Sequence, residues 1–86
     1  MKLLMKPIEM IAWFTKEGVP TPIKYRLMED AANITIKVDR VIIRDEEKLA
    51  GNKMFIYRCQ SILDNTEKIY ELKYEINTCK WFLYKW

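Results

Sequence analysis

The 86-residue sequence contains no histidine. His-based acid/base catalysis, Ser-His or Cys-His nucleophile activation and His-ligated metal sites are therefore excluded. The two cysteines, Cys59 and Cys79, lie far apart in the sequence, so neither belongs to a CxxC redox or zinc motif. There is also no phosphate-binding glycine loop and no nucleophile elbow. We therefore predict a protein without catalytic activity, cofactor or metal.

The sequence also lacks a long apolar run and a large excess of charge. No run approaches the roughly 20 apolar residues that a membrane-spanning helix requires. The apolar start is interrupted by Lys6, Pro7 and Glu9 before it could serve as a secretion signal, so we expect a cytoplasmic protein with no membrane partner. Fifteen basic and twelve acidic residues give a net charge of +3, which is small for a dedicated nucleic-acid binder. Length and composition predict one globular domain over residues 1–86.

Glycine and proline are scarce, with two and three residues, and they fall where turns are expected. The apolar run Ile8 to Thr15 is followed by Gly18, which predicts a hairpin turn there. Pro20 and Pro22 cannot donate to a strand ladder, so the start of the return strand is predicted at a sheet edge.

Two stretches after this turn alternate with the period of two that half-buried strands show. The apolar sides are predicted to be Ile23, Tyr25 and Leu27 in one strand, and Ile34, Ile36 and Val38 in the next. The alternation then shifts by one residue, because Val41 and Ile43 fall at odd-numbered positions like Asp39, and not at even-numbered positions like Val38. We predict a β-bulge or bend at Asp39-Arg40, which would help a small sheet to curl.

One segment, Asp45 to Lys53, has the features of a short helix. Asp45 can cap it, Glu46 and Glu47 suit the positive end of the helix dipole, and Gly51 can end it. An irregular polar loop is an equal alternative. The predicted fold class is therefore all-β, or β-rich α+β with this one helix. About six antiparallel strands would form a curled sheet or a small open barrel.

The C-terminal part, from Met54 to Trp86, predicts a three-stranded meander. Turns at Asp64-Asn65 and Asn77-Thr78 separate its three runs. The register that avoids opposing like charges pairs Leu63 with Thr66, Cys59 with Tyr70, Arg58 with Glu71, Tyr57 with Leu72, Phe55 with Tyr74, Leu72 with Leu83, Tyr74 with Trp81, Glu75 with Lys80 and Ile76 with Cys79. A one-residue slip would destroy both faces, and a slip of two would oppose Arg58 to Lys73.

This register predicts the inner face of the meander. Its members are Phe55, Tyr57, Cys59, Tyr70, Leu72, Tyr74, Ile76, Cys79, Trp81 and Leu83. Both cysteines are on it, but the middle strand separates them by about 9 to 10 Å. That distance is too long for a disulfide, so two buried reduced thiols are predicted.

The predicted outer face of the meander carries more apolar area than a solvated face needs. Met54, Ile56, Ile62, Ile69, Phe82, Tyr84 and Trp86 alternate there with Arg58, Glu71, Lys73, Glu75 and Lys80. Either the N-terminal strands with Trp13 and Phe14 cover this face, or a partner does.

The outer face leads to two functional hypotheses. The first is an interaction or self-association module, such as a homodimer, anchored by Phe82, Tyr84 and Trp86. The alternative is single-stranded nucleic-acid binding, in which the same aromatic residues stack on bases while Arg58, Lys73, Lys80 and Lys85 contact phosphates. Glu71 and Glu75 on the same face weigh against the alternative.

Four segments carry a family resemblance: Asp45 to Met54, Tyr57 to Ser61, Tyr70 to Glu75, and Thr78 to Trp81. With them, most of the chain resembles a family of short β-rich bacterial proteins. The resemblance implies no activity and no ligand, so it leaves both functional hypotheses as they are.

Overall fold

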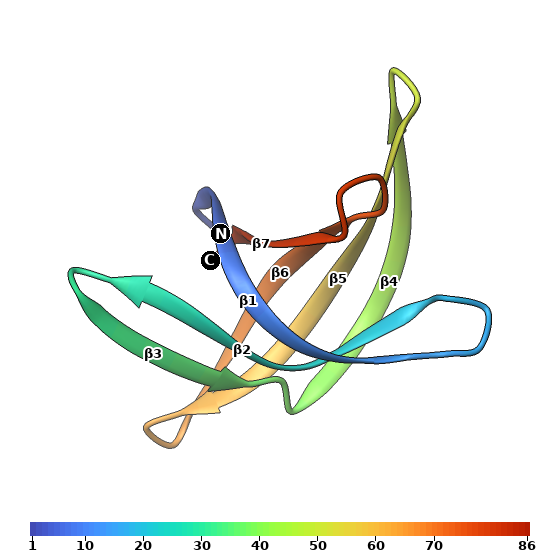
Figure 1. Cartoon of the computed structure of the whole chain (residues 1–86). Coiled ribbons are helices and arrows are strands. Elements are labelled where there is room, and N and C mark those ends of the chain that lie inside the picture. The colour runs from blue at the N-terminus through green and yellow to red at the C-terminus, as the bar shows by residue number, and fades with distance from the viewer.

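The computed structural model describes all 86 residues as one antiparallel sheet of seven strands with no helix (Figure 1). The strands are β1 (Leu3–Phe14), β2 (Pro20–Glu29), β3 (Ala32–Lys37), β4 (Arg40–Leu49), β5 (Asn52–Leu63), β6 (Thr66–Glu75) and β7 (Lys80–Lys85). Their order across the sheet is β3-β2-β1-β7-β6-β5-β4. The prediction of an all-β fold is confirmed, with seven strands in place of about six. The sheet is curled and does not close into a barrel.

β1 connects the two halves of the sheet. Its first half pairs with β7 as far as Ile8, opposite Trp81, and its second half, from Glu9 to Phe14, pairs with β2. Past Ile8 the strand separates from β7, and the sheet folds over so that β2 and β3 face β5 and β6 (Figure 1). Apolar side chains from both halves therefore form one core.

That core occupies the inner, concave side of the sheet. It consists of Tyr25, Leu27, Ile36, Val38, Phe55, Tyr57, Cys59, Tyr70, Leu72, Tyr74, Trp81 and Leu83. Polar contacts link the two halves across it: the Tyr57 hydroxyl donates to the Pro20 carbonyl, and the Ser61 hydroxyl donates to the Lys37 carbonyl at 2.6 Å. At about 1.5 to 3 kcal/mol for each large apolar side chain buried, this cluster stabilises the curled form.

The predicted register of the C-terminal meander is confirmed for both strand pairs. Leu63 pairs with Thr66, Phe55 with Tyr74 and Arg58 with Glu71 between β5 and β6, and Leu72 with Leu83, Tyr74 with Trp81 and Glu75 with Lys80 between β6 and β7. Asp64 and Asn65 have φ angles of 50° and 61°. Both values suit a two-residue hairpin turn.

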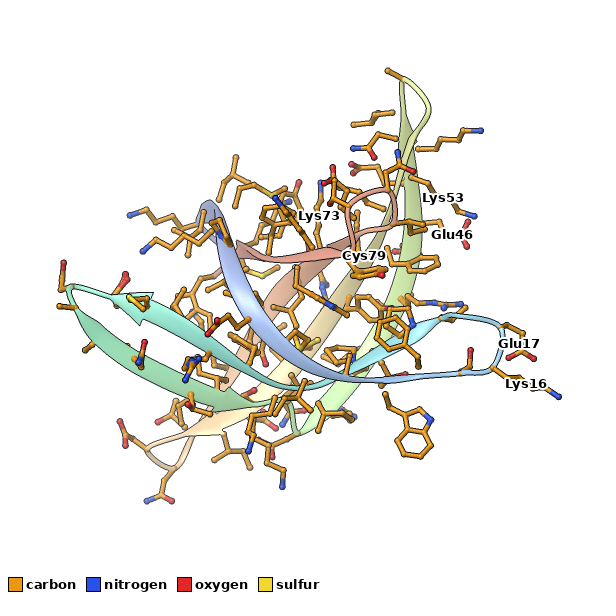
Figure 2. The ribbon with its side chains drawn as sticks, viewed as in Figure 1. Lys16, Glu17, Glu46, Lys53, Lys73 and Cys79 are labelled. Atoms are coloured by element: carbon orange, nitrogen blue, oxygen red, sulfur yellow. The ribbon has the colours of Figure 1, made fainter.

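The second turn of the meander is longer than predicted. It spans residues 76–79, so Ile76 and Cys79 do not form the last strand pair. Contacts with the start of β5 hold this turn. The Asn52 side-chain amide donates to the Glu75 carboxylate at 2.7 Å, and the Ile76 backbone amide donates to the Lys53 carbonyl at 3.2 Å. Cys79 lies in the turn and is exposed (Figure 2), so the prediction of two buried thiols is right for Cys59 and wrong for Cys79. Both cysteines are free, as expected.

The predicted helix at Asp45 to Lys53 is wrong. β4 continues to Leu49, and Ala50 and Gly51, with φ angles of 50° and 81°, form the hairpin turn to β5. The acidic residues that suggested a helix start pair instead across strands. Glu46 contacts Lys53 at 3.3 Å (Figure 2). Glu47 contacts Lys73 at 3.1 Å. These tertiary contacts override a local helix preference, which is weak in short segments.

The hairpin predicted at Gly18 is present. Lys16 and Glu17 lie at its tip (Figure 2), and Gly18 has a φ angle of 87°. β2 is an interior strand, but β3 pairs with it only from Lys24 onward, so Pro20 and Pro22 have a strand neighbour on one side only. The predicted edge position is therefore correct for this end of β2. Both prolines are fully buried.

Bulges change the predicted faces of two strands. Ile11 of β1 pairs with Lys24 of β2 and Ala12 pairs with Pro22, so Ile23 is an extra residue in β2 with no partner on β1. Ile23 therefore points away from the core, while Tyr25 and Leu27 face it. In β4 a shift between Val41 and Ile43 leaves Ile43 exposed. The bend predicted at Asp39-Arg40 is the link where the chain passes from β3, at one sheet edge, to β4, at the other.

Candidate functional site

The structure separates the three aromatic residues predicted to act together. Phe82 and Tyr84 lie on the outer, convex face. Leu83 pairs with Leu72 of β6 and Lys85 pairs with Glu71, so Tyr84 between them is an extra residue that forms a bulge in β7. Beyond this bulge the faces exchange, and Trp86 packs against the core with its ring 5.2 Å from that of Tyr70. The placement of Trp86 on the outer face is therefore wrong.

Two of the four basic residues predicted for the outer face form ion pairs with carboxylates. Arg58 forms an ion pair with Glu71 at 3.1 Å, and Lys73 forms one with Glu47 at 3.1 Å. The Lys73 ammonium also lies 3.9 Å from the centre of the Tyr84 ring. Lys80 is exposed and lies opposite Glu75. Lys80 and Lys85 form no ion pair, and the Lys85 ammonium lies 5.0 Å from the centre of the Tyr84 ring.

The N-terminal strands do not cover the outer face, because they extend the same sheet. Phe14 turns inward and contacts Tyr74 edge-on at 6.1 Å, whereas Trp13 is 72% exposed. Of the two coverings considered from the sequence, burial by the N-terminal strands is therefore wrong. The outer face has no covering strand in the single chain, although Met54 and Lys73 on it are buried.

The outer face of β1 is the largest apolar feature that sequence reasoning missed. Its outward residues Leu3, Met5, Pro7, Ile11 and Trp13 continue onto β7 through Phe82, which pairs with Pro7, and Tyr84. We call these seven residues the outer strip. The inward residues of β1, including Ile8, Met10 and Ala12, pack against the core. β1 is largely apolar at both its odd-numbered and its even-numbered positions. In a sequence this pattern indicates a strand that is buried on both faces.

Both paired and unpaired charges flank the outer strip. Glu9 is the one charged residue within the outward row of β1, and it forms an ion pair with Arg26 of β2 at 2.6 Å. Lys24 of β2 lies opposite Ile11 of β1 on one side and opposite Lys37 of β3 on the other. Like charges in this position repel, and neither lysine has an ion-pair partner in the chain.

The ionisable groups of the core favour their neutral forms. Burial raises the pKa of the Cys59 thiol to about 12, and it raises the pKa values of Tyr57 and Tyr70 to about 12. Burial also raises the pKa of Tyr25, whose hydroxyl has no hydrogen-bond partner in the protein. A thiol with so high a pKa is a poor nucleophile, so Cys59 acts as a packing residue.

The structure contains no group of three or more His, Cys, Asp or Glu side chains placed to hold a metal ion. None of its segments is a helix of the length and apolarity needed to cross a bilayer. No family model, curated protein or solved structure matches the chain. The resemblance to a bacterial family therefore stays a prediction, and function has to be argued from the two faces of the sheet.

Proposed function

We propose that this protein is a non-catalytic self-association module that forms a homodimer through the outer strip. The observation that supports this most directly is the character of β1. Its side chains are apolar on both faces, and the chain itself covers only the inner one. Large exposed apolar patches on soluble proteins are typical of interaction sites.

A second copy of the chain is the partner that fits the strip best. In a two-fold symmetric interface the same patch meets itself, so a patch with unpaired charges would oppose like charges. Within the outward row of β1 the single carboxylate, that of Glu9, is already neutralised by Arg26. The one carboxylate in the outward row of β1 therefore enters a dimer interface already paired, while Lys24, opposite Ile11 on β2, lies at the edge of the strip.

The outer strip is long and narrow. The twelve residues of β1 span roughly 40 Å at about 3.3 Å each. β7 adds width only where it pairs with the first half of β1, up to Ile8. Because each partner in a standard interface buries roughly 800 Å², a dimer through the strip also draws on the residues that flank it.

Nucleic-acid binding is less well supported by the same face. Arg58 and Lys73, two of the four basic residues assigned to phosphates, are held by glutamates. Trp86 stacks on Tyr70 and does not lie beside Phe82 and Tyr84. This alternative nevertheless makes a distinct prediction, namely salt-dependent binding of an oligonucleotide by the monomer.

Sedimentation velocity across a concentration series tests the proposal. We expect the wild-type chain to shift from monomer to dimer in the micromolar to millimolar range. Ile11→Lys, at a side chain that is 60% exposed, should weaken dimerisation at least tenfold. Leu49→Lys, at the 65%-exposed tip of the β4–β5 hairpin, is the matched control and should leave dimerisation unchanged.

Two results would overturn the proposal. One is a wild-type chain that remains monomeric at millimolar concentration. The other is equal weakening by the two lysine variants, which would mean that the outer strip is not the interface. Oligonucleotide binding that falls as salt rises, in a strict monomer, would favour the nucleic-acid alternative instead.

A further inference from the structure

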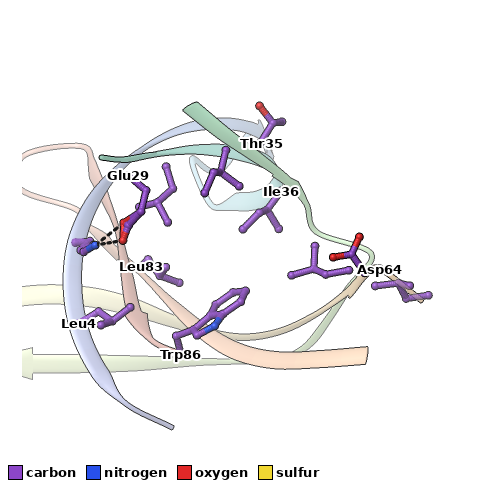
Figure 3. A pocket seen from close by; sticks show the side chains of 12 residues that line it. Leu4, Glu29, Thr35, Ile36, Asp64, Leu83 and Trp86 are labelled. Atoms are coloured by element: carbon purple, nitrogen blue, oxygen red, sulfur yellow. Dashed lines mark hydrogen bonds and ion pairs between the residues drawn. The ribbon is translucent and has the colours of Figure 1, made fainter. Parts of the chain in front are cut away.

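A second apolar surface lies on the opposite, inner side of the sheet, at its open end. There a cavity of about 490 Å³ opens between β1, the β2–β3 hairpin and the β5–β6 hairpin (Figure 3). We call it the mouth cavity. Its apolar lining includes Leu4, Leu27, Ile34, Ile36, Leu83 and Trp86.

The floor of the mouth cavity is held rigidly. Trp86 rests against Tyr70 with ring centres 5.2 Å apart, and its backbone amide donates to the Lys2 carbonyl at 2.8 Å. Leu83 beside it is fully buried. Across the cavity, Ile34 faces inward, because it pairs with the buried residue Leu27. Its side chain is nevertheless 43% exposed, since the cavity lies in front of it. The cavity is therefore a preformed feature of the fold.

The charges around the mouth cavity balance. At one end Lys6 and Glu29 form a bidentate ion pair, with Nζ 2.5 Å and 2.8 Å from the two carboxylate oxygens (Figure 3). At the other end lies the Asp64 carboxylate, and the Lys68 ammonium is 4.8 Å from the centre of the Trp86 ring. Two cations and two carboxylates thus surround an apolar space. An ionised ligand would gain no net attraction there and would lose hydration on entry.

The volume sets the size of the occupant. Ligand pockets commonly measure about 300 to 1,000 Å³ and are mostly apolar with a few polar groups, which describes this cavity. A dry cavity of about 150 Å³ is enough for a benzene ring. The mouth cavity has room for two or three such rings.

We propose that the mouth cavity binds a small uncharged aromatic molecule of two or three rings, lying between Trp86 and the side chains of Ile34 and Ile36. This is a binding activity separate from self-association, because the outer strip lies on the other face of the sheet. A chain that cannot dimerise should bind the molecule as well as the wild type does.

A matched pair of fluorescent probes tests the proposal in the full-length chain. N-phenyl-1-naphthylamine is uncharged, and 1-anilinonaphthalene-8-sulfonate has the same rings with an added sulfonate. We expect the uncharged probe to bind with a stoichiometry of one per chain and at least tenfold more tightly than the sulfonate. Equal or tighter binding of the sulfonate would overturn the assignment of an uncharged ligand.

Two isoleucines with equal exposure locate the binding. Ile34→Lys places an ammonium in the mouth cavity and should weaken binding of the uncharged probe at least tenfold. Ile23→Lys is the control, because Ile23 is also 43% exposed but does not line the cavity. Equal weakening by both variants would show that the probe binds elsewhere and would overturn the proposal. Ile34→Trp, which fills the cavity without adding charge, should also abolish binding, and circular dichroism checks that each variant is folded.

Discussion

Both faces of the sheet carry apolar side chains, but they use them differently. On the inner face, aromatic and aliphatic side chains from both halves of the chain meet in one cluster, and the Tyr57 and Tyr70 hydroxyls have hydrogen-bond partners. On the outer face, apolar residues lie in a strip with no covering element, next to ion pairs such as Lys73 with Glu47. The inner face accounts for the fold, and the apolar strip of the outer face has no covering element in the chain.

Alkaline pH should produce the largest effect, and it should act through the inner face. Burial raises the pKa of Cys59 from 9.0 to about 12, and those of Tyr57 and Tyr70 from 10.0 to about 12. Between about pH 9 and pH 12 the unfolded chain loses these protons while the folded chain keeps them. The folded state then binds more protons, so its stability is complete below pH 9 and falls as pH rises.

Each pKa unit corresponds to about 1.4 kcal/mol, so the summed loss is on the order of the whole stability of a small domain. Urea unfolding midpoints measured from pH 7 to pH 11 should therefore decline steeply above pH 9. A midpoint that stays constant up to pH 11 would contradict the burial of these groups. Iodoacetamide at pH 9 gives an internal control, since exposed Cys79 should be alkylated while Cys59 stays protected in the folded chain.

A pair of alanine substitutions compares the two faces directly. Leu72 is fully buried on the inner side of β6, and Leu72→Ala should destabilise the fold by about 2 to 5 kcal/mol. The change Ile11→Ala, at a side chain of the outer strip that is 60% exposed, should destabilise the fold by no more than about 0.5 kcal/mol. Urea denaturation of both variants measures the difference. Similar losses would mean that the outer residue is buried in solution, as a dimer or another partner would cause.

The smallest expected effect concerns the ion pairs of the outer face. Glu47→Gln leaves the ammonium of buried Lys73 without its carboxylate and should cost about 1 to 3 kcal/mol. Glu46→Gln, at the neighbouring residue, affects an ion pair with half-exposed Lys53 and should cost less than about 1 kcal/mol. The same denaturation measurement separates them. A larger loss from Glu46→Gln would reverse the ranking of the two pairs.

The sequence predicted the β5–β6–β7 register because the candidate pairings could be tested against charges. Only one register satisfied the apolar face and also placed Arg58 opposite Glu71. The errors have a common physical origin in contacts between distant residues. Glu47 pairs with Lys73, and Asn52 holds the turn after Glu75, so neither the strand at Arg40–Leu49 nor the exposure of Cys79 follows from local sequence.

The functional residues were predicted only in part, for the same reason. A single extra residue at Tyr84 moves Trp86 from the outer face to the inner one, and no glycine or proline marks this bulge. Phe82 and Tyr84 were placed correctly on the outer face. The mouth cavity could not be predicted, because residues from β1, β3 and β7 form it only after the sheet has curled.

The pairing of β1 with β7 has a consequence for how the protein is made. β1 is synthesised before the six other strands of the sheet, and one of its edges pairs with β7, so the hydrogen bonds between them cannot form until β7 has been made. Hairpins such as β1–β2 and β5–β6 join neighbouring segments and can form earlier. Closing so long a loop is slow compared with forming these local contacts. During that interval β1 has an unpaired edge and two apolar faces, and at this stage the nascent chain most needs protection from aggregation.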